Sequence, residues 1–241
     1  IGEQALSSDT LGARSTAVGF AALFTQNFTT ATDNYNTAFG YSAGRDTTTG
    51  QNNTFIGGLA AYDGANGNHN TIVGYAAGQN NAASFNTLLG SLTGDGLTDG
   101  ASNVALGYAA LTTDTKGSFS TAVGQQALAT QNFTTATDAH NTGIGNLAGA
   151  VITTGIQNVL VGSLAGDALS DADLNVAVGY GALTSDTFGS NSVAIGGLAL
   201  STQNFTTATD SYNVAVGSLA GRLITTGVSN TLIGGLAGDA I

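Results

Sequence analysis

Apolar and polar residues recur along this chain at a nearly fixed spacing, and every recurrence ends in glycine. Residues 36–40 read Asn-Thr-Ala-Phe-Gly, and the pattern returns as Asn-Thr-Phe-Ile-Gly at 53–57 and Asn-Thr-Ile-Val-Gly at 70–74. Successive motif glycines are mostly 17 residues apart, once 16 and three times 21. The fourteen motif glycines are Gly2, Gly19, Gly40, Gly57, Gly74, Gly90, Gly107, Gly124, Gly145, Gly162, Gly179, Gly196, Gly217 and Gly234. They account for the whole chain, which we therefore treat as a single repeat domain, 1–241.

The four positions before each motif glycine have the character of a β-strand. The first is Asn in ten turns and Ser in three, the second is Thr or Val, and the fourth is Val, Ile, Leu or Phe. The third is Ala, Gly or a large apolar residue. A β-branched column beside an aliphatic column favours strands, and no 3.6-residue period supports a helix. The pattern predicts an all-β fold, a parallel β-roll or β-solenoid of about 14 turns.

Alternation along a strand divides these columns between two faces. The Thr/Val and aliphatic columns share one face, which we expect to point into the coil. The Asn/Ser column and the mixed apolar column share the other, which carries Phe55, Ile72 and Leu88. Because a slim coil encloses only one face, we expect another chain to cover the second. The motif glycines are predicted to allow positive-φ corners, and stacked residues such as Asn36, Asn53 and Asn70 to form amide ladders.

The unit Asn/Ser-x-Ala-Val/Ile-Gly-x-x-Ala resembles the head repeat of trimeric autotransporter adhesins. It reads Ser-Thr-Ala-Val-Gly-Phe-Ala-Ala at 15–22 and Ser-Val-Ala-Ile-Gly-Gly-Leu-Ala at 192–199, and similar repeats occur in phage tail-fibre proteins. The resemblance covers all fourteen turns. It implies a left-handed parallel β-roll, three chains packed side by side, and a surface that binds host molecules. These turns are longer than the family's usual ones, and no stalk or anchor segment is present, so adhesin and tail fibre stay open as alternatives. Because both ends cut through a repeat, we expect a segment of a longer fibre.

Composition narrows the choice of partners. The chain has 36 glycines, no cysteine, four basic residues and a net charge of −11. Four basic side chains cannot follow a phosphate backbone, so we expect no nucleic-acid partner. No apolar run reaches the length of a membrane helix, so we expect no membrane insertion of this segment. Without cysteine there is no disulfide framework and no thiolate metal site.

The three 21-residue turns carry the best candidates for ligand contact. Each contains the same loop, Thr-Gln-Asn-Phe-Thr-Thr-Ala-Thr-Asp, at 25–33, 130–138 and 202–210. Longer repeated loops often carry function, although identity can also reflect recent duplication or a ring that closes a seam between chains. The candidate residues are Phe28, Phe133, Phe205, Asn27, Asn132 and Asn204.

Catalytic and metal chemistry find little support in the residues. His69 and His140 each precede a motif Asn, a turn position that explains them better than general-base catalysis does. A tail-spike depolymerase would need paired acids at a set geometry, whereas the aspartates lie mainly in loops. Calcium is conceivable at Asp167, Asp171 and Asp173, but solvated turn aspartates are the simpler interpretation. We expect no catalytic residue, no cofactor and no resident metal.

Together, these observations lead us to expect that the chain is a non-enzymatic structural and attachment module of an extracellular trimeric fibre. It would lie on a bacterial cell surface or a phage virion and bind a host or cell-surface glycan or protein. Three alternatives stay open, namely a phage tail-fibre shaft or receptor-binding segment, a self-assembling filament subunit, and an ice-binding solenoid. Ice binding needs an outward Thr ladder, whereas we expect that column to point inward.

Overall fold

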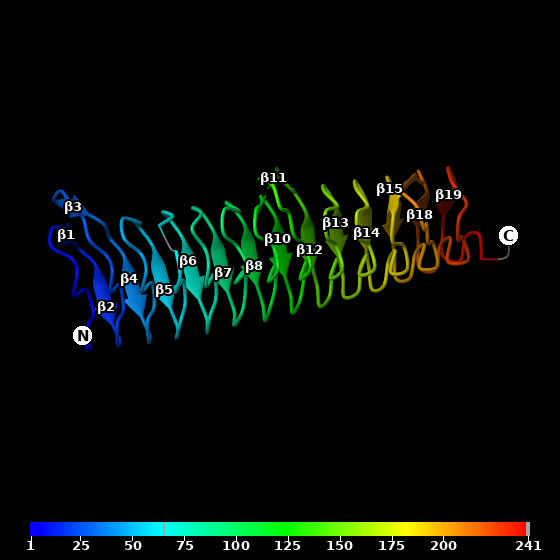
Figure 1. Cartoon of the computed structure of the whole chain (residues 1–241). Helices are drawn as coiled ribbons and strands as arrows, with labels where there is room; N and C mark the ends of the chain where they lie inside the picture. Colours follow the sequence, from blue (N-terminus) through cyan, green and yellow to red (C-terminus); the bar gives the residue numbers. More distant parts are fainter. Residues whose placement is uncertain (65, 240–241) are drawn as a thin grey trace.

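The chain forms a long rod of stacked turns in a computed structural model that describes residues 1–64 and 66–239 (Figure 1). Thirteen turns each contribute one three-residue strand to a single parallel sheet. This confirms an all-β parallel solenoid, with 13 strands because Gly2 has too little chain before it to form one. The strands are β2 (Thr16–Val18), β4 (Thr37–Phe39), β5 (Thr54–Ile56), β6 (Thr71–Val73), β7 (Thr87–Leu89), β8 (Val104–Leu106), β10 (Thr121–Val123), β12 (Thr142–Ile144), β13 (Val159–Val161), β14 (Val176–Val178), β16 (Val193–Ile195), β18 (Val214–Val216) and β19 (Thr231–Ile233).

Three small sheets accompany the 21-residue turns. Each pairs two residues of such a turn with two residues of the turn before it, in parallel. The pairs are β1 (Gly12–Ala13) with β3 (Thr32–Asp33), β9 (Gly117–Ser118) with β11 (Thr137–Asp138), and β15 (Gly189–Ser190) with β17 (Thr209–Asp210). In Figure 1 the labels β3, β11 and β15 mark them along one edge of the rod. Residues 1–64 and 66–239 contain no helix, and so none able to cross a bilayer.

From Gly19 onward, each motif glycine follows the end of a strand and adopts a conformation that favours glycine. Their φ angles lie between +122° and +144°. A Cβ added to Gly107 would stand 2.6 Å from the carbonyl oxygen of Gly124, the motif glycine of the next turn. Left-handed backbone and the close stacking of turns therefore both require a residue without a side chain at this corner.

The two faces of the sheet are the reverse of the sequence-based expectation. In β4, β7 and β8 the middle residue is buried and its two neighbours are exposed. The expectation that the Thr/Val and aliphatic columns point into the coil is therefore wrong. The inward column is the mixed one, so the small Ala and Gly residues there do not face a partner chain.

The asparagine column explains this orientation. The backbone N–H of Asn53 donates to Oδ1 of Asn36 at 3.0 Å, and the Nδ2 of Asn53 donates to the carbonyl of Gly67 at 2.9 Å across the coil. The pattern repeats at Asn70 and beyond. Buried backbone groups need such partners, so the asparagines must lie inside. Strand alternation then brings the mixed apolar column inside with them.

Residue size in the core is balanced within and between turns. Where the middle strand residue is small, the fourth residue after the motif glycine is usually Leu, as in Ala105 with Leu111. Where the strand residue is large, that position is Gly or Ala, as in Leu88 with Gly94. In turns with two small residues, large side chains of the neighbouring turns fill the core. A Cβ on Gly44 would lie 2.5 Å from the ring of Phe55 in the next turn. The coil is thus filled by about one large side chain per turn.

Candidate functional site

The outward face of the 13-stranded sheet is a long surface without charge. One column consists of the first strand residues, all Thr or Val, and the other of the third residues, all Val, Ile, Leu or Phe. Seven of the thirteen members of the second column are exposed, from Ile195 at 38% to Ile233 at 74%, and the other six, all Val, are half-buried. Large contiguous apolar surfaces of this kind mark interaction sites. We call these two columns the sheet face.

Aromatic side chains and histidines flank the sheet face in nine of its thirteen turns, at one end of the strand or at both. The residue after the motif glycine is an exposed aromatic in five turns: Phe20, Tyr41, Tyr75, Tyr108 and Tyr180. The residue before the motif Asn or Ser is aromatic in several others and holds a left-handed φ. His69 stacks on Phe85 with ring centroids 5.3 Å apart, and His140 stacks on Phe119 at 5.2 Å. The structure thus places both histidines in exposed aromatic stacks.

In the 21-residue loops, the candidate phenylalanines are packed and the candidate asparagines bridge turns. Phe28, Phe133 and Phe205 are only 5–6% exposed. The Oδ1 atoms of Asn27, Asn132 and Asn204 each accept a hydrogen bond, at 3.0 Å, from the threonine 17 residues earlier. Any contact of these loops with a ligand would therefore involve their exposed threonines rather than the phenylalanine rings.

A buried carboxylate lies beneath two of these loops, a feature that the sequence analysis missed. Oδ1 of Asp114 accepts from the N–H of Gly117 at 2.9 Å and of Phe133 at 3.3 Å, and Oδ2 accepts from Nε2 of Gln131 at 2.5 Å. Oε1 of Gln131 in turn accepts from Nδ2 of Asn141 at 2.9 Å. A matching network joins Asp186 to Gln203. The Asp-to-Gln spacing of 17 residues, present also at Asp9 and Gln26, was the available signal.

The aspartates considered for calcium bind neighbouring turns. Asp171 accepts from the hydroxyls of Thr153 at 2.6 Å and Thr154 at 2.7 Å, and these bonds hold the pKa of its carboxyl below the usual value. Asp167 accepts from the hydroxyl of Thr184, and Asp173 from the N–H of Ile156. Over the described ranges 1–64 and 66–239, no three His, Cys, Asp or Glu side chains cluster in a way that could hold a metal ion.

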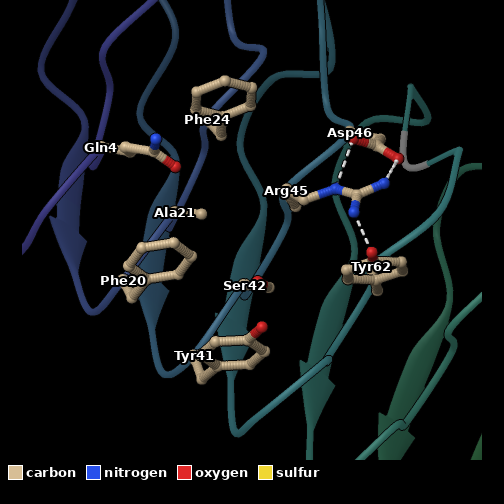
Figure 2. A pocket seen from close by; sticks show the side chains of 9 residues that line it. All are labelled: Gln4, Phe20, Ala21, Phe24, Tyr41, Ser42, Arg45, Asp46 and Tyr62. Carbon is tan, nitrogen blue, oxygen red and sulfur yellow. Dashed lines mark hydrogen bonds and ion pairs between the residues drawn. The ribbon is translucent and has the colours of Figure 1, made fainter.

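A hollow of about 330 Å³ opens near the N-terminal end of the rod (Figure 2). It is lined by Gln4, Phe20, Ala21, Phe24, Tyr41, Ser42, Arg45, Asp46 and Tyr62. Nε of Arg45 donates to Oδ1 of Asp46 at 2.7 Å, and its guanidinium carbon lies 3.8 Å from the ring centroid of Tyr62. The hydrogen bonds to Asp46 raise the pKa of Arg45 above its usual value. The hollow thus combines aromatic rings with one internal ion pair.

No protein-family model, curated protein or solved structure matches the chain. Function must therefore be argued from the three surfaces just described: the sheet face, the 21-residue loops and the N-terminal hollow. The sheet face spans the rod, whereas the hollow occupies a few turns.

Proposed function

We propose that this chain is a non-enzymatic structural and attachment module of an extracellular trimeric fibre, on a bacterial surface or a phage virion. The observation that carries the proposal is the sheet face, an uncharged surface that runs from β2 to β19 on a chain of net charge −11. Leaving such a surface in water is unfavourable, and a second copy offers a matching surface of equal length.

Support for self-association comes from the distribution of charge and size. The fifteen acidic residues all lie outside the two columns of the sheet face, so like-charge repulsion does not oppose its burial. The aliphatic column mixes Val, Ile, Leu and Phe, and an uneven surface of this kind can interdigitate with a partner. The number three comes from the resemblance to adhesin heads, whose chains pack side by side. The remaining sides of each coil would then be free to contact host molecules.

The solution mass tests the proposed assembly. We expect light scattering to give a species close to three times 23.7 kDa that persists on dilution. A monomer over the whole concentration range would overturn the proposed assembly. End-to-end polymers seen by electron microscopy would instead favour a filament subunit, because terminal strands with free backbone groups invite pairing.

Ice binding is a second candidate, and the observed orientation favours it more than the sequence did. The Thr/Val column points outward along the sheet, eight of its thirteen members being Thr. Against this, Phe39 and Leu89 protrude beside the Thr column and make the surface uneven. We expect the purified protein to leave ice-crystal shape and growth rate unchanged. Faceted crystals or slowed growth would reverse the order of the two candidates.

A further inference from the structure

The N-terminal hollow exists because two consecutive turns carry small residues at the second position after the motif glycine. These residues are Ala21 and Ser42, both nearly buried. Elsewhere a small residue at this position stands alone between turns that carry Leu or Gln, as Ala76 does between Leu59 and Leu92. The other leucines of this column are Leu147, Leu164, Leu198, Leu219 and Leu236. Two missing leucine side chains in a row leave a depression with a smooth floor.

Two aromatic rings form one wall of this depression. Phe20 and Tyr41 stack with centroids 5.6 Å apart and planes 10° from parallel. They are 41% and 59% exposed, so each ring keeps accessible surface. Figure 2 shows both rings beside the floor residues, with Phe24 at the far end. Because the rings stack on one another, the surface they offer a ligand consists of their exposed outer faces and edges, against which the apolar face of a small ring can lie.

The hydrogen-bonding groups of the hollow lie on two sides of it and carry no net charge (Figure 2). Arg45 and Asp46 neutralise one another, with side chains 31% and 25% exposed, and Arg45 also donates to the hydroxyl of Tyr62. The amide of Gln4 lies across the hollow from them (Figure 2). An anion would compete with Asp46 for the guanidinium, and a cation would compete with Arg45 for the carboxylate. A neutral ligand with several hydroxyl groups meets neither penalty.

We propose that this hollow binds a neutral saccharide, one pyranose ring lying against Phe20 and Tyr41 with its hydroxyls toward Arg45, Asp46 and Gln4. A pyranose presents C–H groups on one face and hydroxyls around its edge, which matches an aromatic wall with polar groups on two sides of the hollow. The inference rests on the proposed attachment function and assigns it a ligand class. The lining residues follow the motif glycines, beyond the strands, so the hollow stays open if the sheet face is covered.

Saturation-transfer NMR and titration of the whole chain test the proposal. The neutral probes are the methyl glycosides of glucose, galactose, mannose and N-acetylglucosamine. The charged probes are the methyl glycoside of N-acetylneuraminic acid and choline. We expect millimolar binding of at least one neutral glycoside, weakened about tenfold by Tyr41→Ala. Tyr180→Ala, which removes an equally exposed ring from the same column outside the hollow, should leave binding unchanged.

A second pair of variants consists of one that fills the hollow with a residue type found elsewhere in the same column and one control outside the hollow. Ser42→Leu introduces the residue that other turns carry at this position, where Leu adopts the same left-handed φ. It should abolish saturation transfer, whereas Ala76→Leu should not. The inference is overturned if no neutral glycoside binds, if only a charged probe binds, or if Tyr41→Ala and Ser42→Leu bind as well as their controls. A monomer that still binds a neutral glycoside would overturn the trimer and leave the hollow's assignment intact.

Discussion

Single residues in this coil adopt backbone conformations that their type disfavours. Leu111 and Leu128 have φ angles of 53° and 49°, although a non-glycine residue in this region costs on the order of 1 kcal/mol. The same column holds Gly94 and Gly149 in neighbouring turns. The free-energy cost of this backbone conformation is offset by apolar burial, because both leucine side chains are fully buried in the core. Gly and Leu sharing a column is therefore a sequence signal of left-handed backbone.

One buried hydroxyl provides a test at this scale. Oγ1 of Thr47 is buried and finds no hydrogen-bond partner within residues 1–64 and 66–239. Thr47→Val keeps the shape and removes the unsatisfied group, so we expect stability to rise by about 1 kcal/mol. The midpoint of denaturant unfolding, followed by circular dichroism, measures the change. Thr93→Val is the matched control, since the Thr93 hydroxyl donates to the carbonyl of Gly107. It should lower the midpoint, and a fall in both variants would contradict the argument.

At the scale of the turn, two separate constraints require glycine at the motif position: the left-handed backbone and the close stacking on the next turn. Two substitutions can tell them apart. Gly107→Ala should destabilise by more than about 3 kcal/mol, since the methyl would meet both left-handed strain and the backbone of the next turn. Gly234→Ala at the last turn shares the positive φ, but its Cβ meets no described atom within 4 Å. It should cost only the strain, about 1–3 kcal/mol. Equal losses of unfolding free energy would show that the close stacking contributes nothing.

The balance of residue size within a turn is a second property at this scale. Ala105→Leu alone overfills the coil, and Leu111→Gly alone leaves a cavity in it. Each should lower the free energy of unfolding by about 1–5 kcal/mol. Combined, they recreate the arrangement of Leu88 with Gly94 in the turn before. We expect the double variant to be more stable than either single one in a thermal melt. Additive losses would contradict the size balance.

The sequence was sufficient to locate the strands but not their faces. Period and column character placed strands at residues 53–56 and 70–73, and the structure has β5 and β6 there, each beginning one residue later. Each face of a strand carries an apolar column, the mixed column on one face and the aliphatic column on the other. Alternation alone therefore could not decide which face points inward. The deciding factor is Asn53, whose side chain satisfies two backbone groups of the following turn, the carbonyl of Gly67 and the N–H of Asn70. The hollow could not be predicted from the sequence either, because it depends on two small residues that lie side by side only when adjacent turns stack.

For the whole molecule, the sheet face determines the expected assembly. Val161→Lys places a charge near the middle of the outward aliphatic column. We expect it to convert the proposed trimer to monomers, since burying an unpaired ammonium costs several kcal/mol. Thr135→Lys adds the same charge on an exposed loop. It should leave the mass measured by light scattering unchanged. A trimer that tolerates Val161→Lys would place its interface elsewhere.

The paired Asp114 and Gln131 also constrain how such a chain can lengthen or shorten over generations. In most turns the large side chain needed inside comes from the turn itself, so exchanging two such turns would keep the core filled. A recombination event that separated the turn of Asp114 from the turn of Gln131 would instead leave a buried carboxylate without its amide donor. These two turns must therefore be inherited together. The recurrence of Asp9 with Gln26 and of Asp186 with Gln203 is what duplication under that rule would leave behind.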